Sequence, residues 1–260
     1  MRPKVADFLS EMDALAPFAT AEEWDNVGLL AGRSGAEVSR VFITLDLTRE
    51  TLAEAKQRRA ELIIAHHPIL FRGRKNLCED DPEAALLCEM VRSDIAYIAS
   101  HTCLDRSPGG VADTLAAAFA LRNVETGAEG FLRAGDLPAP MTLEALSALA
   151  QETLGASGRP YGPAGRKIGR LAVAPGSAGD FWREALRLGA GAILTGEISH
   201  HDALSALENG LCALEAGHFA TERPVLSRLA ACLQERADML QWNVEFFVSQ
   251  YAPWALKEDM

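Results

Sequence analysis

Short apolar runs alternate with amphipathic segments along the first half of the chain. The apolar runs have the length of buried strands, and the segments between them carry the spacing of helices with one apolar face. The predicted strands are residues 41–45, 62–65 and 95–99, and the predicted helices are residues 5–15, 50–59 and 83–92. Because buried strands that alternate with helices are typical of a largely parallel sheet, this pattern predicts an α/β fold.

The same alternation returns in the second half, after a region rich in glycine and proline. Residues 126–140 are predicted to be a connection, and residues 155–169 a loop, because both hold several of these breakers. The predicted strands are then residues 171–174, 192–195 and 211–214, and the predicted helices are residues 142–154, 181–188, 202–208 and 221–236. We therefore expect two similar α/β lobes, residues 1–125 and residues 126–260.

Histidines mark corresponding places in the two predicted lobes. In each lobe a pair of adjacent histidines follows the second strand, and a histidine with a carboxylate four residues later follows the third strand. These residues are His66, His67, His101 and Asp105 in the first lobe, and His200, His201, His218 and Glu222 in the second. The parallel suggests a duplicated βαβ-type unit.

The composition of the chain indicates that these histidine positions are functional. The chain has 260 residues and only six histidines, and all six fall in those four places. Sites in parallel sheets form outside the carboxyl ends of the strands. Imidazole and carboxylate together are typical ligands of Zn, Fe, Mn, Co or Ni. The adjacent His66 and His67 would converge only where the chain turns, at Pro68, and they suit two ions better than one.

Several classes of function are not expected. The formal net charge of -11 disfavours a broad nucleic-acid-binding surface. No apolar run is long enough for a membrane span, and the five widely spaced cysteines fit reduced thiols in the cytoplasm. Motifs of zinc proteases, P-loops, dinucleotide-binding folds and serine hydrolases are absent. Cys103 lies near the predicted site, but a packed thiol is a better interpretation than a nucleophile.

Five motifs, in order along the chain, carry a resemblance to a known family. They are Glu-Trp-Asp-Asn-Val-Gly-Leu at 23–29, Ala-His-His-Pro-Ile at 65–69, Ser-His-Thr-Cys-Leu-Asp at 100–105, Thr-Gly-Glu at 195–197, and Gly-His-x-x-Thr-Glu at 217–222. Together they resemble the NIF-three-like dinuclear metal proteins, whose members are often named GTP cyclohydrolase I type 2 homologues. The resemblance covers nearly the whole chain.

This resemblance implies a two-lobed α/β fold with a site for two divalent transition-metal ions between the lobes, and a homohexamer. It also implies the short form of the family, without an inserted middle domain. The family ligands correspond to His66, His67, Asp105, His218 and Glu222. The family usually has asparagine at the position of Cys103 and aspartate at the position of Glu197.

The other histidines then become supporting groups or acid–base candidates. His101 is the preferred proton carrier, because Asp105 is four residues away; the alternative is that His101 only positions Asp105. His200 and His201 have no assigned role.

Two functions fit the sequence. The first is a metal-dependent hydrolase of the GTP cyclohydrolase kind, which uses a metal-activated water and a nucleotide substrate. Arg72, Arg74 and Lys75 could bind a triphosphate, although a solvated loop is the favoured interpretation of these residues. The alternative function is a non-enzymatic metal-binding protein that acts in assembly or through partners.

Overall fold

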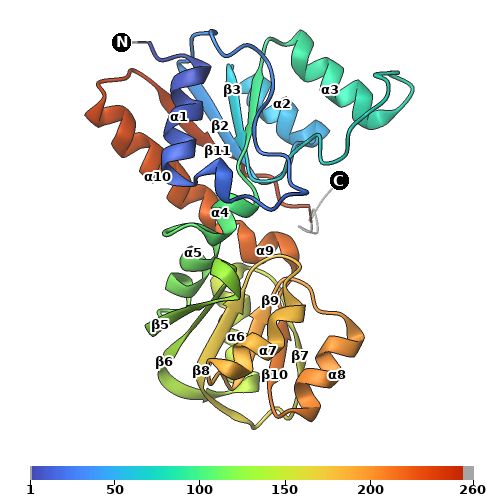
Figure 1. Cartoon of the computed structure of the whole chain (residues 1–260), viewed down its shortest axis with the longest axis vertical. Helices are drawn as coiled ribbons and strands as arrows, with labels where there is room; N and C mark the ends of the chain where they lie inside the picture. The colour runs from blue at the N-terminus through green and yellow to red at the C-terminus, as the bar shows by residue number, and fades with distance from the viewer. Residues whose placement is uncertain (1, 254–260) are drawn as a thin grey trace. The chain divides into compact units, whose positions relative to one another are not determined.

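The computed structural model describes residues 2–253, and these fold into two compact units (Figure 1). The first unit consists of residues 2–104 together with residues 229–253, and the second consists of residues 105–228. This division differs from the expected lobes 1–125 and 126–260, because the C-terminal segment belongs to the first unit. Both units are α/β, as predicted.

The sheet of the first unit has the strand order β1-β4-β3-β2-β11. Strands β2, β3, β4 and β11 are parallel to their neighbours, whereas β1 runs antiparallel to β4. The strands are β1 (Gly28–Ala31), β2 (Arg40–Thr44), β3 (Leu62–Ala65), β4 (Ala96–Ala99) and β11 (Glu245–Val248). The carboxyl ends of β2, β3 and β4 therefore lie at one edge of this sheet.

Helices cover both faces of this first sheet (Figure 1). On one face, Leu52 of α2 and Met90 of α3 pack in a core with Phe42 and Ile63. On the other, Phe8 of α1 lies 5.1 Å from Trp242, measured between ring centroids. The helices are α1 (Val5–Leu15), α2 (Arg49–Gln57) and α3 (Pro82–Arg92), with a 3-10 turn η1 (Phe18–Thr20); α4 (Thr102–Arg106) and α10 (Pro224–Met239) carry the chain from one unit into the other. Burial on both faces explains why the strands are apolar throughout.

The sheet of the second unit has the strand order β5-β6-β8-β9-β10-β7. Strands β8, β9 and β10 run parallel, and β7 is antiparallel to β10. The strands are β5 (Arg122–Gly127), β6 (Leu132–Thr142), β7 (Arg159–Tyr161), β8 (Lys167–Ala174), β9 (Ala192–Thr195) and β10 (Cys212–Glu215).

The second sheet is also covered on both faces, and alternate residues of β8 pack into the two hydrophobic cores. Leu171 and Val173 face a core with α5 and α6, whereas Ala172 and Ala174 face a core with α7 and α8. The helices are α5 (Val111–Ala118), α6 (Leu143–Leu154), α7 (Trp182–Arg187), α8 (His200–Glu208) and α9 (His218–Glu222), with 3-10 turns η2 (Ala128–Gly130) and η3 (Gly179–Phe181).

The two units repeat one order of elements. The series α1-β1-β2-α2-β3-α3-β4-α4-α5 corresponds to the series α6-β7-β8-α7-β9-α8-β10-α9-α10. In both sheets the first three parallel strands lie in chain order, and the preceding short strand is antiparallel to the third. After the first series, β5 and β6 join the second sheet, where β6 pairs with β8; after the second series, β11 joins the first sheet and pairs with β2. This arrangement accounts for the return of the C-terminal segment to the first unit.

The expected connection over residues 126–140 is wrong. Most of it is β6, an interior strand that pairs with β5 and β8. Its prolines, Pro138 and Pro140, fall where the register with β8 shifts between Asp136 and Met141, so no regular ladder bond is lost there. These prolines therefore indicate an irregularity within a strand rather than a loop.

Two further boundaries differ from the expectation. The loop 155–169 contains β7 and the start of β8. The expected helix 221–236 is divided into α9 and α10, and Pro224 begins the second of these helices. Proline is tolerated in the first turn of a helix, where its missing N–H has no partner to lose.

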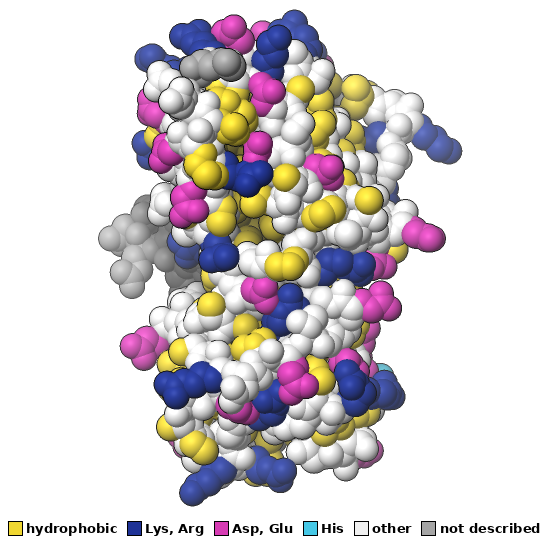
Figure 2. All heavy atoms as spheres, turned by 60° about the vertical axis from the view of Figure 1, so that its left-hand side comes forward, with side chains coloured by type: hydrophobic (Ala, Val, Ile, Leu, Met, Phe, Trp, Pro, Cys, Tyr) yellow, Lys and Arg dark blue, Asp and Glu magenta, His cyan; other side chains and the backbone are white. Residues whose placement is uncertain are grey.

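The surface carries charge of both signs. On the face in Figure 2, Lys and Arg side chains are interspersed with Asp and Glu side chains, and hydrophobic side chains lie between them. Among residues 2–253, no helix is long and apolar enough to cross a membrane.

Candidate metal centre

Two adjacent histidines, His66 and His67, directly follow the last residue of β3. His66 is only 2% exposed, and the ring centroids of His66 and His67 lie 4.8 Å apart. His101 follows β4, the neighbouring strand, and its ring centroid is 5.2 Å from that of His66 and 5.4 Å from that of His67. One ligand atom from each of the three rings lies within 4.8 Å of the others. We call His66, His67 and His101 the histidine cluster.

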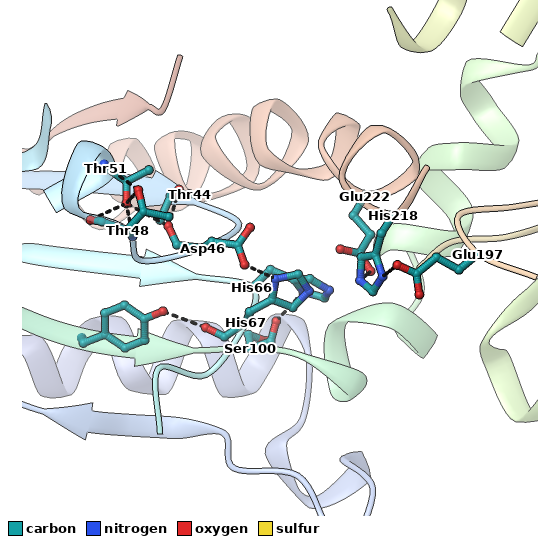
Figure 3. Close-up of polar contacts among 11 residues, drawn as sticks. Thr44, Asp46, Thr48, Thr51, His66, His67, Ser100, Glu197, His218 and Glu222 are labelled. Atoms are coloured by element: carbon teal, nitrogen blue, oxygen red, sulfur yellow. Dashed lines mark hydrogen bonds and ion pairs between the residues drawn. The ribbon is translucent and has the colours of Figure 1, made fainter. Parts of the chain in front are cut away.

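An oxygen atom holds the Nδ1 atom of each ring in the histidine cluster (Figure 3 shows His66 and His67). Nδ1 of His66 lies 3.0 Å from the carbonyl oxygen of Ser100, and Nδ1 of His67 lies 2.8 Å from Oδ1 of Asp46. Nδ1 of His101 lies 2.9 Å from Oδ1 of Asp25. An oxygen partner places the ring proton on Nδ1, so Nε2 is the nitrogen that each ring presents as a ligand or base.

Asp25 is a fixed anion beside His101. Its side chain is fully buried, and Thr102 donates hydrogen bonds to it from both its backbone N–H and its hydroxyl. Burial by itself would raise the pKa of Asp25, but the hydrogen bonds from His101 and Thr102 and the charge of His101 together hold it well below its ordinary value. The expected partner of His101 was Asp105; in the structure the hydrogen-bond partner is Asp25.

Asp46 supports His67 in a comparable way from the end of β2. The hydroxyls of Thr44 and Thr51 each donate to the backbone carbonyl of Asp46, at 3.0 Å (Figure 3). The side chain of Thr48 caps α2 by accepting a hydrogen bond from the backbone N–H of Thr51. The start of α2 therefore fixes the residue that orients His67.

The other predicted ligands lie in the second unit, on short helices. Nε2 of His218 is 3.0 Å from Oε1 of Glu222, one turn further along α9, and Nδ1 of His218 is 3.3 Å from Oε1 of Glu197 (Figure 3). Asp105 and Glu222 each offer a carboxylate oxygen, and these two atoms lie within 4.8 Å of each other. We call Asp105, His218 and Glu222 the carboxylate cluster. The spacing of four residues places His218 and Glu222 on one face of α9.

Two glycines make room for the carboxylate cluster. A Cβ atom on Gly176 would lie 2.5 Å from Oε1 of Glu222, and Gly176 has a φ of +67°, which favours glycine. A Cβ atom on Gly196 would lie 2.5 Å from the carbonyl oxygen of Gly176 and 2.8 Å from Cα of His218. These contacts let a nearly buried carboxylate, Glu222, sit against the backbone.

His200 and His201 do not join either cluster. Both are exposed and begin α8, whereas the residues directly after β9 are Gly196 and Glu197. The alignment of His200-His201 with His66-His67 is therefore wrong: four residues separate the second pair from its strand. Cys103 is fully buried, and burial raises the pKa of its thiol, although a hydrogen bond with Ser100 opposes this; the interpretation as a packed thiol is confirmed.

The residues present fit transition-metal ions. Imidazoles oriented through Nδ1, together with grouped carboxylates, form the donor set that Zn, Fe, Mn, Co and Ni prefer. Sequence reasoning missed Asp25 and Asp46 as the groups that orient His101 and His67. Asp25 lies within the motif at 23–29, and Asp46 directly follows an apolar strand, so a carboxylate at a strand end was the available signal.

Comparison with known proteins gives a consistent result. A sequence model of the family described as Duf34/NIF3 (NGG1p interacting factor 3) matches residues 3–253. A Clostridium perfringens protein named "GTP cyclohydrolase 1 type 2 homolog" is 33% identical over 258 residues, which cover 96% of this chain and 97% of that protein. A Streptomyces coelicolor protein of the same name is also 33% identical, over 97% of this chain and 94% of that protein. The crystal structure of a Staphylococcus aureus hypothetical protein is 28% identical with a TM-score of 0.93, and covers 100% of both chains.

Proposed function

Because the chain belongs to the Duf34/NIF3 family, we propose that it is a metal-dependent hydrolase of the GTP cyclohydrolase I type 2 kind, with two divalent transition-metal ions. The observation that carries the proposal is the histidine cluster, in which every ring is turned by an oxygen atom so that Nε2 is presented. Histidines that bind a metal almost always donate their other ring N–H to a carboxylate, a backbone carbonyl or water, and all three rings of the cluster have a carboxylate or carbonyl oxygen at Nδ1.

The proposed ligands are the five that the family pattern indicates. They are His66 and His67 of the histidine cluster, and Asp105, His218 and Glu222 of the carboxylate cluster. Bound ions of this kind supply a water that ionises near neutral pH and a Lewis acid that polarises the substrate. Which of Zn, Fe, Mn, Co or Ni is bound is a matter for elemental analysis, because this donor set suits all of them.

We assign His101 the role of proton carrier. Asp25 stays ionised and accepts a hydrogen bond from Nδ1–H of His101, which leaves Nε2 as the basic atom of the ring. A histidine oriented by a buried carboxylate can take a proton from an attacking water and return it to the leaving group. Asp25 acts through His101 and is a positioning residue.

The names of the relatives suggest the substrate. Proteins called GTP cyclohydrolase 1 type 2 homolog are 33% identical to this chain over nearly its whole length, which supports a purine nucleotide whose ring is opened by water. We further propose a cytoplasmic homohexamer. None of the five cysteines, all within the described residues, forms a disulfide, which suits a reducing compartment.

The test measures metal content and turnover on the same preparations. Purified protein should hold about two transition ions per chain, and metal-loaded protein should hydrolyse members of a panel of nucleotides and phosphoesters. The variant His67→Ala should lose metal and turnover together. The variant His101→Gln should keep its metal and lose roughly 100-fold or more in kcat, with the basic limb of the pH profile altered.

Each alternative gives a different result. Equal inactivity of the wild type and His67→Ala across the panel would favour the non-enzymatic alternative, a metal-binding protein that acts in assembly or through partners; the family description as an interacting factor fits that alternative. Loss of metal from His101→Gln would make His101 a ligand rather than a proton carrier. Full metal occupancy in both Asp105→Asn and Glu222→Gln would show that the proposed ligand set is wrong.

A further inference from the structure

Two exposed aromatic side chains stand beside His101 in the first unit. Trp24 is 58% exposed and Phe71 is 49% exposed, and their ring centroids lie 5.6 Å apart. The centroid of His101 is 6.0 Å from that of Trp24 and 6.3 Å from that of Phe71. Two large apolar rings therefore face solvent next to the ring that we assign as proton carrier.

These rings are exposed but held in place by the backbone around them. Asn26 donates a hydrogen bond of 2.7 Å from Nδ2 to the carbonyl oxygen of Leu70, which joins the segment of Trp24 to the segment of Phe71. Asp25, between Trp24 and Asn26, is fixed by Thr102 and His101. The pair is thus preorganised, which lowers the entropic cost of binding a ligand on it.

The other two tryptophans among residues 2–253 are less exposed, since one is buried in a core and one is half-buried. Trp182 is 4% exposed, and Trp242 packs on Phe8. Exposed apolar area is unfavourable relative to buried area, so a fixed exposed aromatic pair beside polar groups is typical of a binding surface. An aromatic ring of a ligand stacked on the pair would recover that free energy.

Phe71 lines a cavity of about 570 Å³, which is the size of a small-molecule site. His67, Asp46, Tyr97 and Arg72 also line it. Arg72 is exposed and makes no ion pair with any residue between 2 and 253, so its guanidinium is available to an anion. The neighbouring Arg74, in contrast, is bound by Asp81 at 2.7 Å and Glu83 at 2.6 Å.

We propose that Trp24 and Phe71 form the stacking surface for a planar heteroaromatic ring, and that Arg72 binds an anionic group on the same ligand. This inference rests on the proposed function, because Trp24, Phe71 and Arg72 would be the residues that determine which substrate the proposed hydrolase binds. The ligand class is a phosphorylated nucleoside or a compound of the same chemistry.

Calorimetric titration with three probes separates the contributions of the ring and the anion. The probes are guanosine 5′-monophosphate, guanosine, which lacks the phosphate, and ribose 5-phosphate, which lacks the base. Trp24→Leu and Phe71→Leu should each weaken the binding of the nucleotide and of guanosine about tenfold or more, the size of one base–aromatic stacking contact, and leave ribose 5-phosphate unchanged. Arg72→Ala should weaken the nucleotide and ribose 5-phosphate, and leave guanosine unchanged.

Two variants at exposed positions serve as matched controls. Leu77→Ala removes an apolar side chain that is 56% exposed, and Lys167→Ala removes one exposed positive charge in the second unit; both should bind all three probes as the wild type does. Thermal melting of each variant, without ligand, checks that the fold is retained. Sedimentation of the same samples shows whether the aromatic pair instead contacts a second copy of the chain.

The outcomes distinguish this inference from the proposed hydrolase. Equal nucleotide affinity in the wild type, Trp24→Leu and Phe71→Leu would overturn the inference, and so would a lowered assembly mass in these variants with unchanged affinity. Absence of nucleotide binding to the wild type at millimolar concentration would overturn it as well. Binding that follows the predicted pattern without turnover would support the inference while contradicting the hydrolase; turnover with a KM unchanged by either aromatic substitution would do the reverse.

Discussion

The two units have the same order of elements but place different chemistry at the end of the second parallel strand. In the first unit β3 is followed at once by His66 and His67; in the second unit β9 is followed by Gly196 and Glu197, and the histidine pair comes four residues later. In both series of elements the short helix after the third parallel strand carries an acidic residue, Asp105 in α4 and Glu222 in α9. The repeated fold thus supplies equivalent positions, and the residue at each position decides which donor atoms it offers.

The supporting groups differ in burial as well. Asp25, which holds His101, has a side chain that is 0% exposed, whereas Glu197, which approaches His218, is 54% exposed. A buried hydrogen-bonded carboxylate fixes its partner, and an exposed one is screened by water. His101 in the first unit is therefore held more rigidly by its carboxylate than His218 in the second unit is.

The largest expected difference between the two units concerns metal binding by their histidine pairs. His66→Ala should lower the affinity for metal by more than the roughly 10–100-fold that loss of an outer-shell partner costs, because a ligand itself is removed. His200→Ala and His201→Ala, at exposed positions of α8, should keep the wild-type metal content. Metal titration of the stripped proteins measures both. Equal losses in the two sets would show that the unit containing α8 also uses its histidine pair.

Gly196 follows β9 as His66 follows β3, and a side chain added at Gly196 should have a smaller effect, on stability. Gly196→Ala puts a Cβ atom 2.5 Å from a backbone oxygen, and we expect overpacking of about 1–3 kcal/mol. For a chain of this size that is a fall in Tm of roughly 2–4 °C per kcal/mol. Gly165→Ala, where a Cβ atom would meet nothing within 4 Å, is the control. An unchanged Tm for Gly196→Ala in the metal-free protein would mean that the backbone there yields easily.

The smallest predicted difference concerns the two supporting carboxylates. Asp25→Asn should lower the stability of the metal-free protein by about 2 kcal/mol at pH 7, the loss of hydrogen bonds to a charged group. Glu197→Gln should cost under about 1 kcal/mol, because its side chain is largely in water.

The pH dependence gives this third prediction its sign. The pKa of Asp25 is lower in the folded protein than in the unfolded chain, so its contribution is present above the unfolded pKa of about 3.9 and is lost as pH falls toward the folded value. The gap in Tm between the wild type and Asp25→Asn should therefore be largest near neutral pH and narrow below about pH 4. A gap that is constant with pH would mean that the charge of Asp25 contributes nothing to stability.

Much of the fold could be predicted from the sequence, because fully buried strands leave an unbroken apolar signature. Strands β3 and β9 have the predicted bounds, and so does helix α1. Strand β6 was missed, because Gly135, Pro138 and Pro140 are typical of a loop, whereas the register shift that accommodates the two prolines arises from pairing with β8, much later in the chain. The position of a bulge is a property of the paired strands, and one strand alone does not reveal it.

The sequence by itself determined the donor chemistry of the site: six histidines confined to a few strand ends and helix starts, with carboxylates four residues after two of them. Only the tertiary structure decided which of these side chains meet, and which groups orient them. Asp25 is 76 residues from His101 and Asp46 is 21 residues from His67, and neither spacing carries a periodic signal. Local patterns report secondary structure and ligand type; the contacts between strand ends depend on sheet order, which long-range packing sets.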